Sequence, residues 1–395
     1  MRRAVTGAAL AALVLAAGLG GGTRTAQADA PPLPSKPQVI NIIDVGGALA
    51  LTQKAMEKYR DTHPKLVSRM TFTKAPAPEL AGKIKAQQQA GRLDIDLVIG
   101  GTDGVSAGME LNEWTEVLPQ YADKFSGLEE RYLPAARKMN DLAKGQALAV
   151  VYYPSGPLLE FMPGAVKDPP KSTAALLDWC KAHPNRFMYA RPANSGPGRT
   201  FLQALPYLLG DKDPKDPVNG WDKTWAYLKE LNSCIEYYPT GTGATMKELG
   251  EGSRDMIVST TGWDINPRAI GVVPKEAQVG KLDGFHWVAD AQYLAVPKGI
   301  ANDKLAVVLD LMAYLLTPEA QAYTYDDGYF YPGPAIKDVP VTMAPAESQQ
   351  VIKEFGRPEY EQWIADNPIE IPLFGKDLVI AFQKWDQEIG GAKSK

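Results

Sequence analysis

Short apolar runs alternate with longer helical segments early in the chain, and this alternation restricts the fold more than any other feature. Residues 39–43, 70–73 and 95–99 have the composition of strands, and the intervening segments 48–62 and 78–91 have helical periodicity with proline and glycine at their ends. Strands joined by helices in this way pair in parallel with right-handed crossovers. The sequence therefore predicts an α/β fold.

Glycine-rich polar loops follow the first and third of these strands directly. In parallel sheets, ligands bind beyond the carboxyl ends of the strands. Glycine also lets a ligand approach the backbone closely. The residues expected at this edge are Asp44, Gly46, Gly47, Gly101, Thr102 and Asp103.

The chain of 395 residues is longer than a single core usually accommodates, which favours two lobes. The apolar strand 147–153 enters a proline-bounded connection at 154–157, the expected first crossing between lobes, and 287–296 is the expected return. Each lobe is expected to hold a mainly parallel sheet flanked by helices, followed by a helical C-terminal tail that packs partly on the second lobe. The expected boundaries are 31–152 with 293–395 for the first lobe and 153–292 for the second.

The N-terminus has the layout of a secretion signal. Arg2 and Arg3 precede an uncharged Ala/Leu-rich run at 4–22, and Ala26-Gln27-Ala28 offers a cleavage site. A membrane anchor is the alternative, but the run is short and interrupted by glycine. We therefore expect residues 1–28 to be removed as a signal peptide and the mature protein to be periplasmic.

The net charge bears on which molecules the protein binds, and the cysteine content bears on whether it contains a disulfide. The net charge of −4 comes from interspersed signs without a basic stripe, so nucleic acid is not expected as a partner. The two cysteines, Cys180 and Cys234, are expected to form a disulfide in an oxidising compartment, the alternative being two buried thiols. We expect a monomer without a cofactor.

Two segments resemble a signature of bacterial extracellular solute-binding proteins: residues 293–302 (YLAVPKGIAN) and 315–322 (LLTPEAQA). Residues 153–157 and 247–252 resemble the same family, and its YnjB-like branch is the most similar. The resemblance implies a two-lobe type II periplasmic binding fold with two crossings and hinge closure. It also implies delivery of a small solute to the inner-membrane permease of an ABC importer. Relatives bind polyamines, ferric iron, thiamine, phosphonates or sugars, so the ligand stays open.

The loop 195–200 (SGPGRT) precedes a predicted helix and combines unpaired backbone N–H groups with hydroxyls and a guanidinium. Ser195, Gly198 and Arg199 are therefore expected to hold a carboxylate or phosphonate. The alternative is a plain loop with a solvated arginine. For a cationic ligand, the expected partners are instead Asp44, Asp103 and Asp264.

Aromatic side chains at the strand ends offer flat walls for a ligand. Trp263, just after Thr261, is the strongest candidate, although most aromatic side chains serve the core. The other aromatic candidates are Tyr152, Tyr153, Tyr293, Tyr329 and Tyr331. A ferric ion would need phenolates from Tyr237, Tyr238, Tyr323, Tyr325 or Tyr329. No histidine or carboxylate supports such a cluster, so no metal site is expected.

A secreted serine esterase is the alternative function, because residues 104–108 (GVSAG) match G-x-S-x-G around Ser106. A nucleophile elbow needs its serine on the turn between strand and helix, whereas four residues separate Ile99 from Gly104. His183 and His286 are the available bases, and no oxyanion segment is present. We therefore expect a binding protein and not an enzyme.

Overall fold

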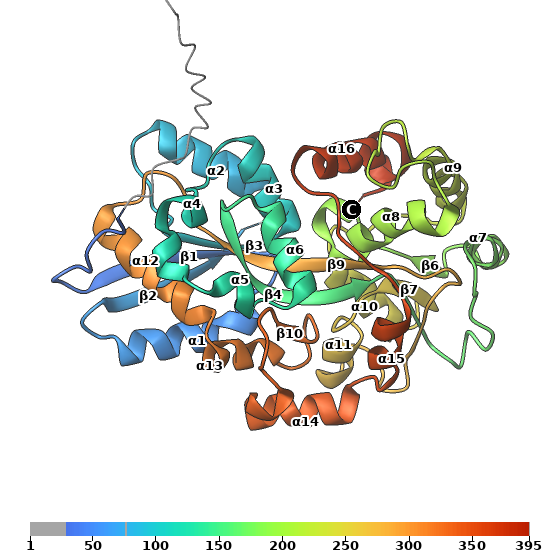
Figure 1. The fold of residues 1–395 in the computed structure, drawn as a ribbon. Helices are drawn as coiled ribbons and strands as arrows, with labels where there is room; N and C mark the ends of the chain where they lie inside the picture. Colours follow the sequence, from blue (N-terminus) through green and yellow to red (C-terminus); the bar gives the residue numbers. More distant parts are fainter. Residues whose placement is uncertain (1–28, 76, 395) are drawn as a thin grey trace, which may run out of the picture.

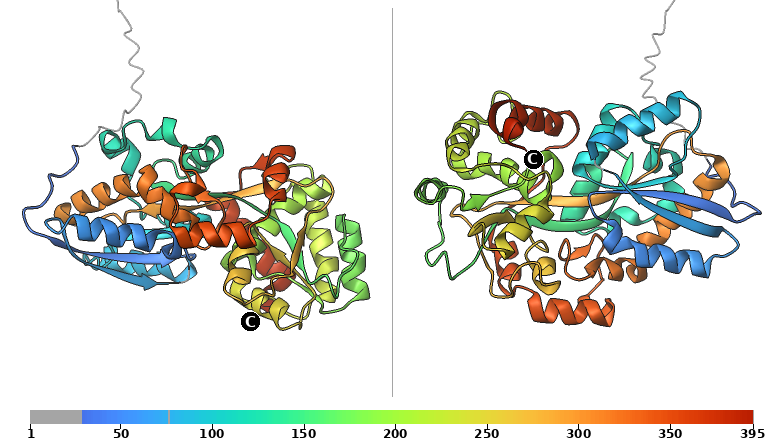
Figure 2. Two further views of the ribbon diagram at one scale, coloured as in Figure 1. Left: turned by 90° about the horizontal axis from the view of Figure 1, so that it is seen from below. Right: turned by 180° about the vertical axis from the view of Figure 1, so that it is seen from behind.

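The computed structural model describes residues 29–75 and 77–394 (Figure 1). The predicted signal peptide, residues 1–28, lies outside the described residues. Two lobes lie side by side and are joined by long strands, as Figure 2 shows from two further directions. The expected two-lobe α/β arrangement with a helical C-terminal tail is confirmed.

In the described part of the chain, the first lobe holds a seven-stranded sheet in the order β10-β4-β9-β3-β1-β2, with β11 also paired to β9. Strands β1, β2 and β3 pair in parallel as predicted, but β9 runs antiparallel to both β3 and β4. The sheet is therefore mixed and not mainly parallel, because β9 returns from the second lobe. The strands are β1 (Gln38–Val45), β2 (Val67–Lys74), β3 (Leu97–Gly101), β4 (Ala147–Gly156), β9 (Trp287–Ala295), β10 (Gly333–Pro334) and β11 (Ile369–Glu370).

Helices cover both faces of this sheet (Figure 1). They are α1 (Leu49–Thr62), α2 (Ala77–Gln89), α3 (Thr102–Glu110), α4 (Val117–Tyr121), α5 (Leu128–Arg131), α6 (Pro134–Leu142), α12 (Asn302–Leu315) and α13 (Pro318–Gln321). Helix α1 buries Thr52, Ala55, Met56 and Tyr59, the spacing of one helical face.

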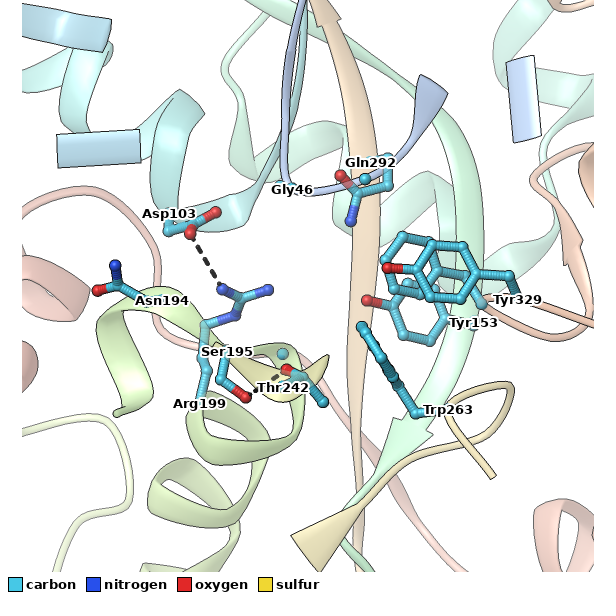
Figure 3. Close-up of a pocket in the computed structure, with 14 residues that line it drawn as sticks. Gly46, Asp103, Tyr153, Asn194, Ser195, Arg199, Thr242, Trp263, Gln292 and Tyr329 are labelled. Carbon is cyan, nitrogen blue, oxygen red and sulfur yellow. Dashed lines mark hydrogen bonds and ion pairs between the residues drawn. The ribbon is translucent and has the colours of Figure 1, made fainter. Parts of the chain in front are cut away.

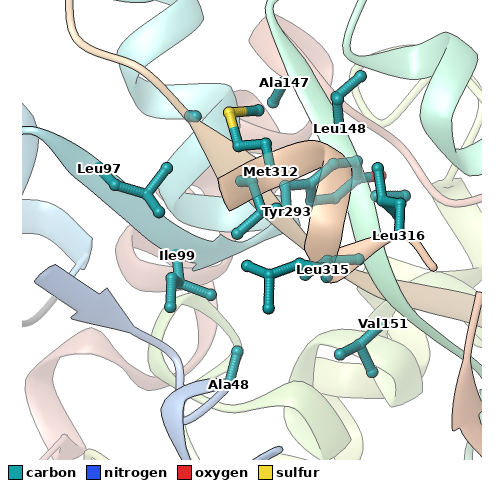
Figure 4. Close-up of a cluster of buried hydrophobic side chains, with 14 of the residues drawn as sticks. Ala48, Leu97, Ile99, Ala147, Leu148, Val151, Tyr293, Met312, Leu315 and Leu316 are labelled. Atoms are coloured by element: carbon teal, nitrogen blue, oxygen red, sulfur yellow. The ribbon is translucent and has the colours of Figure 1, made fainter. Parts of the chain in front are cut away.

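Helix α12 lies on the sheet and supplies much of the first lobe's core (Figure 4). Met312 and Leu315 pack there with Leu97 and Ile99 of β3 and Val151 of β4. Among the described helices none alone is long and apolar enough to span a bilayer. Within the described residues, one bent pair of helices, α12 with Pro318–Tyr325 at 71°, has the length and apolar composition of a span.

The second lobe has a four-stranded sheet in the order β6-β7-β5-β8, in which only β6 and β7 pair in parallel within the described residues. This sheet too is mixed, contrary to the expectation. Its elements are β5 (Leu158–Phe161), β6 (Phe187–Met188), β7 (Met256–Ser259), β8 (Gln278–Gly280), α7 (Thr173–Ala182), α8 (Gly196–Leu209), α9 (Asp222–Leu231), α10 (Thr242–Gly250) and α11 (Ile265–Ala269). The predicted disulfide is confirmed: Cys180 on α7 is bonded to Cys234, with Cα atoms 5.8 Å apart.

The lobe boundaries differ from those expected. The positions 152/153 and 292/293 fall inside β4 and β9, because residues 153–156 and 288–292 still pair within the first sheet. The chain passes between the sheets near Pro157, which connects β4 to β5, and between β8 and β9.

The C-terminal tail crosses between the lobes a third time, through α14 (Ala346–Phe355), α15 (Glu359–Asp366) and α16 (Gly375–Trp385). Helix α14 carries an ion pair to each lobe. Glu347 lies 3.2 Å from Lys54 on α1, and Glu354 lies 2.6 Å from Lys275 in the second lobe. Beyond it, Trp385 is part of the core of the second lobe, while α16 also packs against α3.

Candidate ligand-binding site

A cavity of about 200 Å³ lies between the lobes, beside the crossing strands β4 and β9 (Figure 3). The first lobe and the crossing strands contribute the loop after β1, the junction between β3 and α3, side chains of β4 and β9, and a turn of the C-terminal region. The second lobe contributes the segment before α8, its first turn, and the starts of α10 and α11. The lining residues are Gly46, Gly47, Gly101, Asp103, Tyr153, Asn194, Ser195, Gly196, Arg199, Thr242, Trp263, Gln292, Tyr329 and Phe330.

Many of the residues expected from the sequence meet in this cavity. They come from both lobes and from the crossing strand β4. These residues are Gly46, Gly47, Gly101, Asp103, Tyr153, Ser195, Arg199, Trp263 and Tyr329. These residues therefore lie around one cavity.

Two expected residues, Asp44 and Tyr293, are buried and do not line the cavity. The Asp44 carboxylate accepts a hydrogen bond from the backbone N–H of Leu49 at 3.3 Å and so occupies the start of α1. Burial raises the pKa of Asp44, while the neighbouring backbone N–H groups and Lys74 oppose this shift. Tyr293 lies in the core of the first lobe, where its hydroxyl donates to the Met139 carbonyl at 3.0 Å.

Three further expected residues lie just behind the lining. The Thr102 hydroxyl donates to Asp290 at 3.2 Å, and the backbone N–H of Thr261 donates to the Ser155 carbonyl at 2.9 Å. Gly198 packs so tightly that a Cβ atom there would stand 2.2 Å from the Ala190 carbonyl oxygen. These residues hold the lining in place but do not form it.

The structure adds lining residues that the sequence did not single out: Asn194, Gly196, Thr242, Gln292 and Phe330. Gln292 neighbours Tyr293 on β9, and successive side chains of a strand point to opposite faces. If the face of β9 that lies toward the cavity had been known, the alternation of side chains along the strand would have identified Gln292. The hydroxyls of Thr242 and Ser195 are hydrogen-bonded at 2.7 Å.

Arg199, on the first turn of α8, is paired with two carboxylates. Its Nη2 atom lies 2.6 Å from Asp290 Oδ2, and its Nη1 atom lies 3.4 Å from Asp103 Oδ2. Burial alone would lower the pKa of Arg199, but the charges of Asp290 and Asp103 outweigh it and raise the pKa. Tyr153 also donates to Asp290, at 2.9 Å. The guanidinium is therefore not the free anion-binding group expected from the sequence.

Aromatic rings form the opposite wall. Tyr153 stacks on Phe330 at 4.9 Å between ring centroids, Phe330 stacks on Tyr329 at 4.1 Å, and Trp263 meets Tyr329 edge-on at 5.0 Å. Gly262 allows the segment around Trp263 to lie close to the backbone of Phe330. Its φ is +86°, and a Cβ atom there would stand 2.4 Å from the backbone nitrogen of Phe330. Burial, followed by the nearby carboxylates, raises the pKa of Tyr329, so its hydroxyl stays protonated at neutral pH.

Ser106 does not have the geometry of an esterase nucleophile. It lies inside α3, fully buried, and its hydroxyl accepts a hydrogen bond from the backbone N–H of Gly375 at 2.9 Å. The Nδ1 atom of His183 contacts the Trp179 carbonyl, and that of His286 lies 2.9 Å from Glu370. Within the described residues neither histidine is hydrogen-bonded to Ser106.

The tyrosines considered for a ferric site do not gather at one point. Tyr238 is buried in the core of the second lobe, and Tyr237 donates to Glu248. Tyr325 donates to the Val339 carbonyl at 2.7 Å, so of the five only Tyr329 lines the cavity. No cluster of three His, Cys, Asp or Glu side chains suited to a metal occurs in residues 29–75 and 77–394.

The chain belongs to the family described as bacterial extracellular solute-binding protein, whose sequence model matches residues 54–351. No protein among the curated sequences matches it. Its two lobes, with a cavity between them, have the type II binding fold.

Several solved structures share the fold. A structure described as the Atu4243-GABA receptor has a TM-score of 0.61 at 17% identity, covering 89% of this chain and 95% of its own. The spermidine/putrescine substrate-binding protein PotD from Streptococcus pneumoniae has a TM-score of 0.57 at 13% identity, covering 88% and 99%. Apo ferric ion-binding protein A from Pasteurella haemolytica has a TM-score of 0.59 at 14% identity, covering 88% and 97%. At these identities the likeness extends to the fold alone.

Proposed function

We propose that this protein is exported to the periplasm, captures a small polar solute between its lobes, and delivers it to the inner-membrane permease of an ABC importer. One observation carries the proposal: the cavity is lined by Gly46 and Gly101 from the first lobe and by Ser195 and Trp263 from the second. Assignment to the YnjB-like branch, and action as a monomer, belong to the same proposal.

Closure of the lobes follows from where the contacts lie. A solute that touches Asp103 on one side and Trp263 on the other gains both contacts only when the lobes approach each other. It therefore stabilises the closed arrangement through its higher affinity for that state. The connections near Pro157 and between β8 and β9 serve as hinges, because few residues there need to change conformation. The permease recognises the closed shape.

The lining residues have different parts in this mechanism. Asp103 and Gln292 offer polar contacts, whereas Trp263 and Tyr329 offer ring surfaces. Asp44, Thr102, Gly198 and Thr261 support the lining from behind, and Tyr293 supports the core beneath β9.

A solute screen followed by small-angle scattering tests the proposal. Thermal unfolding of the mature protein is measured with polyamines, amino acids, phosphonates, thiamine, sugars and ferric chelates. A ligand that binds only the folded state raises Tm by mass action. Scattering with the solute that raises Tm most should give a smaller radius of gyration than scattering without it. An unchanged Tm with every solute, or an unchanged radius with a bound solute, contradicts the proposal.

A further inference from the structure

The buried charges at the cavity do not balance. Asp103 and Arg199 are the charged side chains among the lining residues, and Asp290 lies directly behind them. Two carboxylates thus share one guanidinium. Arg199 lies much closer to Asp290, at 2.6 Å, than to Asp103, at 3.4 Å. Asp103 is therefore the carboxylate whose charge is left for a ligand, because an incompletely paired charge in a buried site strongly favours an opposite charge.

Two acceptor oxygens at the cavity lack donors. Asp103 Oδ1 and Gln292 Oε1 are both buried and have no hydrogen-bond partner anywhere in the described chain. Gln292 as a whole is only 2% exposed. Leaving such an acceptor unsatisfied is costly, and a ligand N–H removes that cost.

Each of these acceptors lies close to a glycine of the first lobe. A Cβ atom on Gly101 would stand 2.7 Å from Asp103 Oδ1, and one on Gly46 would stand 3.3 Å from Gln292 Oε1. A larger residue at either position would crowd the acceptor. In Figure 3, Asp103 and Gln292 lie along one side of the cavity, and Tyr329 and Trp263 lie beyond Gln292.

The rest of the cavity suits the same kind of ligand. The faces of aromatic rings attract cations, most strongly where water is excluded. Positively charged side chains other than Arg199 do not occur among the lining residues. The volume of about 200 Å³ lies below the roughly 300–1,000 Å³ of pockets for drug-sized ligands, so the solute is small.

We infer that the captured solute is a small organic amine in its protonated form, whose N–H groups donate to Asp103 Oδ1 and Gln292 Oε1 while its carbon skeleton lies against Tyr329 and Trp263. The inference rests on the proposed function, since it concerns the same cavity. It replaces the anionic ligand that the loop 195–200 suggested from sequence.

Two series of probes, in which the charge changes on a fixed skeleton, test the charge preference. The first is butane-1,4-diamine, 4-aminobutanoate and butanedioate, and the second is benzylamine, benzyl alcohol and benzoate. Calorimetric titration should show that an amine binds most tightly in at least one series and that neither carboxylate-only probe binds. The inference is overturned when neither amine binds, or when an anion or the neutral alcohol binds more tightly than its matching amine.

Asp103→Asn tests the residue assignment, because it removes the charge with little change of shape. The affinity for the preferred amine should fall by at least roughly 30-fold, the lower end of the effect of removing one partner of a buried charge pair. Asp94→Asn is the matched control: its exposed carboxylate pairs with Arg92, and its removal should leave affinity unchanged. Unaltered amine binding by Asp103→Asn overturns the inference.

Gln292→Leu is the second variant, and it removes the amide without changing the charge. It should weaken amine binding less than Asp103→Asn does, and ligand-free melting shows whether each variant folds.

The solute screen separates the proposal of solute capture from the inference that the solute is an amine. If a sugar or a phosphonate raises Tm and closes the lobes while amines do not, solute capture stands and the amine inference fails. If no solute acts, both fail.

Discussion

Trp263 lies half-buried at the edge of the cavity and packs edge-on against Tyr329. Trp263→Ala should therefore lower affinity for the captured solute about tenfold, since an aromatic contact contributes roughly 0.5–1.5 kcal/mol beyond the area it buries. Calorimetric titration with the solute that raises Tm most measures the loss. Trp179→Ala is the control, because Trp179 is also half-buried but stacks on His183 outside the cavity. Equal affinities of the two variants would remove Trp263 from the site.

Glu160 is a second residue whose effect can be measured, through the dependence of stability on pH. It is fully buried on β5, and burial, followed by the charge of Asp264, raises its pKa from 4.5 to about 8. A carboxyl group with a raised pKa in the folded state holds its proton there after the unfolded chain has lost it. Wild-type stability should therefore fall as pH rises from about 4.5 through 8.

Glu160→Gln removes this titration, so urea denaturation should show the variant gaining stability relative to wild type between pH 5 and pH 8. Replacement of the exposed Glu276 by Gln should give no such pH-dependent gain. A constant difference between Glu160→Gln and wild type over this range would show that Glu160 is ionised throughout it.

Residue positions could be predicted where the local sequence determines them. Gly46 and Asp103 follow apolar strands immediately, so their place at the end of the sheet was visible. Tyr293 was expected in the site because it is aromatic, yet the register of β9 turns Gln292 toward the cavity instead. The face that a crossing strand presents depends on its pairing with distant strands. Thr242 is the first residue of α10, and no motif there pointed to the site, so it was not predictable.

At the scale of elements, the disulfide fixes α7 to the segment that follows α9. Cys180 and Cys234 are 54 positions apart, and loop closure of that length stabilises the fold by about 4 kcal/mol. Replacing both cysteines by serine should lower the free energy of unfolding by about that amount in urea denaturation. Reductant should destabilise the wild type similarly and leave the double variant unaffected. A wild type insensitive to reductant would contradict this assignment.

Helices with local start and stop signals matched the prediction closely. Ser172 caps α7 by accepting the N–H of Ala175 at 3.1 Å, and α1 ends just before Pro64. The start of α8 was expected after the loop 195–200 but lies at Gly196, because Ser195 accepts the N–H of Gly198 and so begins the helix earlier. The antiparallel pairing of β9 was not visible locally, since strand direction depends on the whole path of the chain.

At the scale of the whole molecule, two lobes could be predicted from the chain length and from the two strands expected to cross between them, at 147–153 and 287–296. They did not reveal the third passage of the chain between them. Helix α14 is amphipathic like many surface helices, and nothing in its sequence indicates that Glu347 and Glu354 contact different lobes. Long-range docking of this kind follows from complementary surfaces that only the folded lobes possess.

This third passage also bears on biogenesis. Trp385 and Ile389 belong to the core of the second lobe, although the strands of that lobe lie at 158–280. A ribosome makes Trp385 and Ile389 after all of these strands, so a nascent chain that already contains every described strand of the lobe still has an uncovered apolar surface. Such surfaces bind chaperones and aggregate readily. The second lobe therefore keeps an uncovered apolar surface until Trp385 and Ile389 have been added to the chain and have packed against it.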